Sequence, residues 1–284
     1  MEIKNIEFEL FRFQLLPVTT HVTTDLFHEI KSTEDVRKNK NKFFWEIMSE
    51  FPEFSHKSLE LNQKLILKED HWIVFKLAAH KSLERENVDF KKEQIENWPC
   101  VTVLINNDPD VQVIAVSKNR KAFSSGSVIT NLIQESLSSH LLQYQLSMHV
   151  EAIFDKNEFW SIVEQHRGKI TNIRFELISP NMASISKSLE LDLKQINKDT
   201  NSHKTVVELN SPEGATLEIE KTNKTINSLV DYSSEGGGDI SFKIMGYKKR
   251  KHTSKSVSSI DIDEITIENI SSDKLETFVS LFTN

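Results

Sequence analysis

Apolar and polar positions alternate or recur along this chain in patterns that predict short strands and amphipathic helices. Residues 3–16 are apolar and aromatic on both faces, which is typical of a strand covered on both sides. Residues 24–51 carry apolar side chains at helical spacing, with Thr24 as a candidate N-cap. Residues 58–70 and 71–80 then predict two strands joined by a turn.

The best hairpin signal lies in the middle of the chain. Alternating apolar residues at 101–105 and 111–116 flank the sequence Asn-Asn-Asp-Pro-Asp, which has the composition of a turn. A long amphipathic helix is predicted from Ser127, followed by a strand at 146–152 and a helix capped by Asp155.

A second folding unit is predicted after Gly168, which ends the preceding helix. It opens with a strand at 170–178 and a helix at 185–198, and continues with a hairpin formed by 206–209 and 215–219. The remaining predicted elements are a helix at 225–232, a strand at 239–244, a late strand at 260–270 and a terminal helix at 275–281.

These elements predict an α+β (mixed α/β) fold with two domains. Residues 1–168 form a larger N-terminal sheet-and-helix domain, and residues 169–284 form a smaller C-terminal α+β domain. The chain has 284 residues, of which 38% are hydrophobic and 27% charged, as is ordinary for soluble globular proteins. It is therefore long enough to bury a core.

The chain has seven glycines, and three of them are consecutive, at Gly236, Gly237 and Gly238. Backbone at these positions must turn or be approached closely, and we interpret them as a hinge. A predicted strand follows, and where it ends the chain becomes strongly cationic. This basic run consists of Lys248, Lys249, Arg250 and Lys251, with His252 next to it and Lys255 extending it.

On a loop the basic run would reach into solvent, and a phosphate backbone is the polyanion that it suits best. The alternative is a solvated surface turn with no ligand. A second group of cations, Lys118, Arg120 and Lys121, follows the central hairpin. The net charge is −7, so any contact with nucleic acid is expected to be local.

Cysteine usage and hydropathy suggest a location. A single cysteine, Cys100, excludes an intramolecular disulfide and any zinc site with two thiolates, which fits a reducing cytoplasm. The acidic N-terminal segment does not have the pattern of a signal peptide. No apolar run approaches the ~20 residues of a membrane-spanning helix, so we expect no membrane segment.

Motifs of catalysis are missing from the sequence. It contains no HExxH, GxSxG, Walker lysine loop or GxGxxG motif, and we predict no catalytic residue, no cofactor and no metal. Asp261, Asp263 and Glu264 are the one candidate metal set, because alternating carboxylates on a strand point to one side. The alternative, which we prefer, is that these carboxylates form the solvent face of an amphipathic edge strand.

The layout of the chain resembles that of the RexA family of phage-exclusion proteins, and of proteins found in bacterial phage-defence settings. The resemblance covers about residues 100–282 and rests on the order of VTVLINNDPDVQVIAVSK, a helix, a strand, IRFELISPN and DYSSEGGGDISFKIMGYKKRK. It implies a two-part protein with a movable second domain, which dimerises into a clamp and binds duplex DNA with little sequence preference. No catalytic residue of the family is carried over.

Three functions follow as hypotheses. The first is a non-catalytic, sequence-nonspecific DNA-binding sensor or effector in anti-phage defence, in which the two cation groups contact phosphates of double-stranded DNA. The second is a metal-dependent nuclease that uses the three carboxylates. The third is a protein-binding subunit that recruits a second defence protein. A homodimer is expected with the first, because a two-fold axis would bring two basic runs onto one face of an acidic protein.

Overall fold

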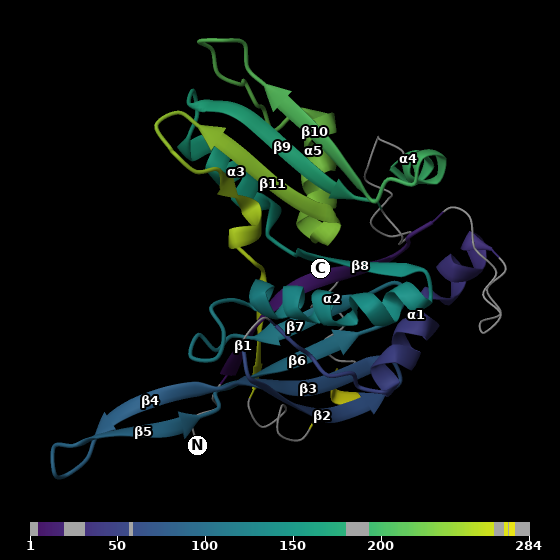
Figure 1. Cartoon of the computed structure of the whole chain (residues 1–284). Helices are drawn as coiled ribbons and strands as arrows, with labels where there is room; N and C mark the ends of the chain where they lie inside the picture. Colours follow the sequence, from purple (N-terminus) through teal and green to yellow (C-terminus); the bar gives the residue numbers. More distant parts are fainter. Residues whose placement is uncertain are drawn as a thin grey trace. The chain divides into compact units, whose positions relative to one another are not determined.

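The computed structural model describes residues 5–19, 32–56, 59–179, 193–263, 270–271 and 273–275 (Figure 1). Antiparallel strand pairs alternate with helices along the described chain, which confirms the predicted α+β fold. None of the helices in these ranges combines the length and the apolar character needed to cross a bilayer.

The chain forms two compact units, and each is assembled from separated segments. Unit 1 comprises Met1–Glu9, Lys42–Leu141 and Ser259–Asn284, and unit 2 comprises Leu10–Asn41 and Leu142–Ser258. This division differs from the predicted domains 1–168 and 169–284. The difference arises because both ends of unit 1 pair with each other, Phe8 opposite Ile260 for example, and because the helix before Gly168 packs with the strands that follow it.

Strand β1 (Asn5–Pro17) contributes to both units. In unit 1 the strand order is β13 (Ser259–Asp263), the start of β1, β7 (Val113–Ser117), β6 (Cys100–Asn106), β3 (Trp72–Ala79) and β2 (Leu61–Glu69). The predicted central hairpin is confirmed, since β6 and β7 pair antiparallel from Asn106 opposite Val113. The two predicted strands before it are confirmed as β2 and β3.

Two helices of the first half of the chain can be compared with their predicted positions. Helix α1 (Thr33–Ser49) begins later than predicted: the Ser32 hydroxyl accepts from the Asp35 amide at 3.1 Å and caps it, whereas Thr24 lies outside the described residues. Helix α2 (Gly126–Gln143) buries a stripe at helical spacing, as predicted. That stripe consists of Ile129, Leu132, Ile133, Leu137 and Leu141.

A hairpin that the sequence did not predict projects from unit 1 in Figure 1. It consists of β4 (Lys81–Glu86) and β5 (Lys92–Asn97), which pair only with each other. All of its residues are exposed or half-buried, and Val88 and Phe90 at its tip are 94% and 87% exposed. Its polar composition on both faces hides the period-2 signal of a half-buried strand.

Unit 2 is built on a second antiparallel sheet, in the order β10 (Lys204–Asn210), β9 (Ile170–Ile178), β11 (Gly238–Ile244) and β12 (Lys251–His252). Helices α3 (Lys156–Gln165) and α5 (Lys224–Tyr232) lie on the same side of it (Figure 1). On that side the alternate residues Ile173, Phe175 and Leu177 of β9 join the helices in an apolar core. The opposite face is therefore polar, and residues of this face line the pocket described below.

Several other predicted elements can be compared with unit 2. Asp155 caps α3 through the Asn157 amide, as predicted. Residues 215–219 do not form the predicted strand. The Leu217 amide donates one hydrogen bond to the Ile170 carbonyl, and the side chains of Leu217 and Ile219 pack against the core. The structure describes helix α4 as Leu193–Thr200, the end of the predicted helix, whose start lies outside the described residues.

Unit 2 also contains the pair formed by β8 (Leu146–Ala152) and the second half of β1, called here the β1–β8 ribbon, in which β8 is the seventh strand of the first sheet. Strand β8 pairs antiparallel with Phe11–Pro17 of β1. The predicted strand at 146–152 is thus confirmed, but its partner, 129 to 141 residues earlier in the sequence, was not predicted. At the far end of the chain, the predicted strand and helix after Asp263 fall almost entirely outside the described residues.

Candidate functional site

The exposed part of the basic run lies in the connection between β11 and β12. Lys248 and Lys249 are exposed, and neither has a hydrogen bond or ion pair to any residue that the structure describes. Lys255, in a short 3-10 helix (Thr253–Lys255), is exposed as well. These three ammonium groups are accessible to a polyanion.

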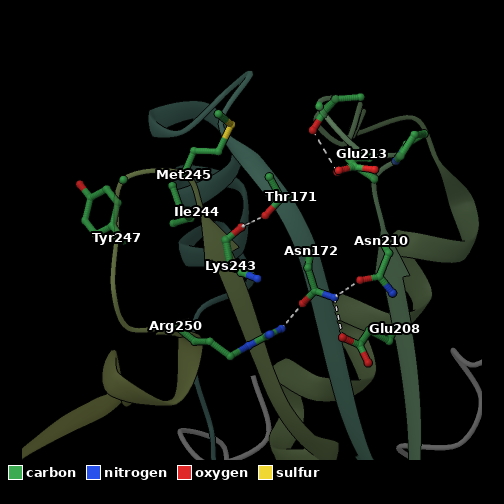
Figure 2. A pocket seen from close by; sticks show the side chains of 15 residues that line it. Thr171, Asn172, Glu208, Asn210, Glu213, Lys243, Ile244, Met245, Tyr247 and Arg250 are labelled. Carbon is green, nitrogen blue, oxygen red and sulfur yellow. Dashed lines mark hydrogen bonds between the residues drawn. The ribbon is translucent and has the colours of Figure 1, made fainter.

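Arg250 has a different role from its neighbours in the run. Its Nε donates to the Ser241 hydroxyl at 2.9 Å, and its Nη2 donates to the Ser241 carbonyl at 3.3 Å and to the side-chain oxygen of Asn172 (Figure 2). It is half-buried against the polar face of the sheet. We therefore assign Arg250 to the hydrogen bonding of the sheet rather than to the exposed cations.

Tertiary folding adds two cations that the sequence analysis missed. Arg167 and Lys169, in the turn between α3 and β9, are exposed. This turn meets the end of β11, where the Met245 amide donates to the Lys169 carbonyl at 2.8 Å. In the sequence, the one local sign that these cations lie on a turn was their position on either side of Gly168. In the structure Gly168 has a φ of 70°.

Two further contacts fix the turn beside the basic run. The rings of His166 and Tyr247 lie edge to face, 5.3 Å apart, and Lys251 Nζ donates to Gln165 Oε1 at 3.3 Å. Burial, and then the charges of Lys251 and Lys169, lower the pKa of His166. We call Arg167, Lys169, Lys248, Lys249 and Lys251 the basic cluster.

A pocket of about 540 Å³ adjoins the basic cluster on the polar face of the sheet (Figure 2). Lys243 and Arg250 on one side face Glu208 and Glu213 on the other, so the charges of the lining balance. Asn172 connects the two sides, because its amide nitrogen donates to Glu208 Oε1 at 2.5 Å and to Asn210 Oδ1 at 2.8 Å while its oxygen accepts from Arg250. Hydrogen bonds thus connect the two sides of the pocket wall.

The second predicted cation group belongs to unit 1 and is partly neutralised. Lys118 Nζ donates to Glu7 Oε1 at 2.9 Å. That hydrogen bond, together with the charges of Lys118 and Arg120, lowers the pKa of Glu7. Arg120 and Lys121 are exposed. Because this group and the basic cluster belong to different units, the folding of neither unit brings them together.

The three consecutive glycines are buried and closely packed. A Cβ at Gly236 would overlap the Arg12 side chain, one at Gly237 the Tyr232 ring, and one at Gly238 the Glu176 carbonyl. Gly236 also has a φ of 83°, which disfavours other residues. At these positions neighbouring segments approach the glycines closely, and the hinge stays a prediction.

A buried polar cluster lies next to these glycines. In the β1–β8 ribbon Arg12 is opposite Glu151, and Arg12 Nε also donates to the Glu235 carbonyl. Burial raises the pKa of Glu151 to about 7; the negative charge of Asp239 adds to the shift and the positive charge of Lys204 opposes it. Burial also raises the pKa of Glu235, against the effect of Arg12. Perturbed carboxylates of this kind mark a candidate functional region.

The alternative metal set gains no support from the described residues. Asp261 and Asp263 lie on β13 and flank Ile262, which is buried, while Glu264 lies outside the described residues. Nowhere in the described ranges do three His, Cys, Asp or Glu side chains come together in a way that could hold a metal ion. The arrangement of β13 is that of an amphipathic edge strand.

Comparison with known proteins adds no family assignment. The chain matches no protein-family model, no curated protein and no solved structure. The functional argument therefore rests on the geometry of the basic cluster and its surroundings.

Proposed function

We propose that the protein binds the phosphate backbone of double-stranded DNA without reading its sequence, and that the basic cluster makes the contacts. The observation that carries the proposal is the meeting of two turns, one with Arg167 and Lys169 and the other with Lys248 and Lys249. A cation pair on one turn is common on any protein surface. Two such pairs held side by side by backbone and ring contacts form a patch that can neutralise several phosphates at once.

The chemistry of the cluster favours phosphate contact over base recognition. Lysine ammonium groups on turns act as point charges and give position without sequence information. Of the guanidinium groups of the basic run and the neighbouring turn, that of Arg250 is already committed to Ser241 and Asn172, and that of Arg167 is exposed. Because the chain has a net charge of −7, the DNA is expected to touch this patch and to avoid the rest of the surface.

The biological setting of the proposal comes from the layout that resembles the RexA family. On that basis we propose a sensor or effector role in bacterial anti-phage defence, in the cytoplasm, with a homodimer as the DNA-binding form. Two-fold symmetry would double the number of cations on one face without exposing the DNA to acidic surface. A protein-binding subunit that recruits a second defence protein is a separate alternative, in which the basic cluster would contact that partner and DNA would not bind.

The direct test is a titration of a fluorescent duplex, in two unrelated sequences of equal length, at salt concentrations from about 50 to about 200 mM. We expect equal affinities for the two sequences and a steep loss of affinity with salt. Magnesium and a chelator are added in parallel, with cleavage scored on a gel, so that a nuclease is detected if present. Failure to bind either duplex at the lowest salt would refute the proposal.

Matched variants distinguish the effect of the basic cluster on DNA affinity from the effect of net charge. Lys248→Ala with Lys249→Ala is compared with Lys91→Ala and Lys92→Ala, which remove the same charge from the exposed β4–β5 hairpin. We expect weaker binding only for the first pair. Equal weakening by both pairs would show that net charge, rather than the basic cluster, governs binding.

A further inference from the structure

Three side chains of unit 2, none of them in the basic cluster, converge at one end of the β1–β8 ribbon. Ser147 and His149 lie two residues apart on β8 and therefore on one face, and His203 immediately precedes β10. The Ser147 hydroxyl is 3.3 Å from His149 Nε2 and 3.3 Å from His203 Nδ1, and the two ring nitrogens are 3.4 Å apart. The three atoms thus form a nearly equilateral triangle.

The size of this triangle matches a known coordination geometry. Two ligand atoms bound to Zn²⁺ at 2.0–2.1 Å in tetrahedral directions lie about 3.3–3.4 Å apart. All three sides of the triangle have this length. A hydrogen bond explains the geometry less well, because the 3.4 Å between the imidazole nitrogens exceeds the usual 2.7–3.2 Å of N–H donors.

The proton positions also favour a metal. His203 Nε2 is 2.7 Å from the Pro17 carbonyl oxygen, which can only accept, so Nε2 carries the proton and Nδ1 presents a lone pair to the triangle. A backbone carbonyl that orients the far nitrogen is the usual support of a metal-binding histidine. The Ser147 hydroxyl has an acceptor of its own, the Leu16 carbonyl at 3.3 Å, so its oxygen lone pairs can also face the triangle.

A second observation is the side chain opposite His149. Gln14 pairs with His149 across the ribbon and is 1% exposed. Its side chain interacts with the Tyr232 hydroxyl, and this interaction opposes the burial that raises the pKa of Tyr232. Directly opposed residues on antiparallel strands have Cβ atoms about 4.5–5.5 Å apart. Gln14 is therefore a buried polar side chain on the same face of the ribbon as His149, and the proposed ligands are His149, His203 and Ser147 alone.

We propose that His149, His203 and Ser147 form a binding site for a divalent transition-metal ion such as Zn²⁺. Two imidazoles and a hydroxyl select Zn²⁺, Co²⁺, Ni²⁺ or Cu²⁺ over Mg²⁺ and Ca²⁺, which prefer sets of oxygen ligands. Lys204 follows His203, but its ammonium group is paired with Glu176, which reduces its repulsion of a cation. The ion would join the ribbon to the start of β10 and stabilise unit 2, independently of the proposed DNA binding.

The test is calorimetric titration of the chelator-treated full chain with Zn²⁺, with Co²⁺ absorption as a probe of geometry. We expect one ion per chain, the visible bands of tetrahedral Co²⁺, no binding of Mg²⁺ and a higher melting temperature with Zn²⁺. His149→Ala and His203→Ala should each weaken Zn²⁺ binding at least tenfold. His71→Ala, in unit 1, should leave the binding unchanged.

A conservative variant keeps the test valid if an alanine variant fails to fold. His203→Cys supplies a thiolate in place of the imidazole, so it should retain Co²⁺ and add a sulfur charge-transfer band. Absence of saturable one-to-one binding by the wild-type chain would overturn the proposal. So would wild-type affinity in both histidine-to-alanine variants, because the three side chains would then be a hydrogen-bonded group and the ion would bind elsewhere.

Discussion

Arg250, from the most cationic stretch of the chain, donates its guanidinium Nη2 to the side-chain oxygen of Asn172 at the centre of the second sheet. The same Asn172 side chain donates to Glu208 on the neighbouring strand. One member of the basic run is therefore part of the polar face of the sheet, whereas the two residues before it are exposed. This difference between neighbours can be measured.

Arg250→Ala should lower the free energy of unfolding by about 1–3 kcal/mol, because the buried Asn172 oxygen and the buried Ser241 lose their charged donor. Lys249→Ala, one residue away, should change it by less than about 0.5 kcal/mol. Urea denaturation of the two variants at one pH makes the comparison. Equal midpoints would contradict the assignment of Arg250 to the sheet.

The basic cluster should set the salt dependence of DNA binding. Each phosphate contact contributes about −0.9 to the logarithmic salt slope, so replacing Lys248 and Lys249 by alanine should flatten the slope by about 1.8. Adding Arg167→Ala and Lys169→Ala should bring the total change to about 3–4. Fluorescence anisotropy over a salt series gives the slopes, with melting temperatures as the control for folding. A wild-type slope in the four-alanine variant would remove the support for the cluster.

Gly236 and Gly246 allow the cost of backbone strain to be compared with the cost of steric overlap. Gly236 and Gly246 both have a φ of 83°, but a Cβ at Gly246 meets nothing within 4 Å whereas one at Gly236 overlaps Arg12. Gly246→Ala should cost about 1–2 kcal/mol for the left-handed backbone alone. Gly236→Ala should cost clearly more, since the Arg12 backbone and side chain must also move. Chemical denaturation measures the free energy of unfolding of both variants. Equal decreases would mean that the segments around Gly236 move easily, as expected of a hinge.

The pKa of Glu151 predicts a pH dependence of stability. Burial raises this pKa from 4.5 to about 7, so between these values the unfolded chain loses the proton that the folded chain keeps. Stability contributed by the protonated form is complete below about pH 4.5 and is lost as the pH rises through about 7, by about 1–3 kcal/mol.

Glu151→Gln removes the titrating group and should abolish this loss, so that the variant gains stability over wild type as the pH rises to about 8. Denaturation curves across this range, recorded with a chelator present, test the sign. Glu96→Gln, on the exposed β4–β5 hairpin, serves as the control and should follow the wild type. A parallel pH profile for Glu151→Gln and wild type would contradict the prediction.

A last prediction concerns association. The proposed DNA-binding form is a homodimer, so light scattering at micromolar concentration should return about twice the chain mass of 32.8 kDa. The duplex titration should then saturate at one duplex per two chains. A mass of a single chain under both conditions would remove the dimer from the proposal.

Local patterns were sufficient for elements whose partners are close in sequence. The turn residues after Ile105 predicted the β6–β7 hairpin, and Asp155 predicted the start of α3, because turn and cap preferences depend on hydrogen bonds within a few residues. Alternation also predicted β9 and β11. The β4–β5 hairpin was missed because an exposed ribbon has no buried face to impose a period on its residues.

The sequence by itself determined the α+β class, most strands and helices of the described chain, and the existence of an exposed cation pair at Lys248 and Lys249. Only the tertiary structure decided that β1 pairs with β13 and β8, that Arg250 belongs to the sheet, and that Arg167 and Lys169 join the basic cluster. The meeting of His149 with His203 was decided in the same way. The physical reason is that turn and cap preferences depend on neighbouring residues. Contacts between distant segments depend instead on how whole elements bury their apolar faces, and this burial is established only when the chain folds.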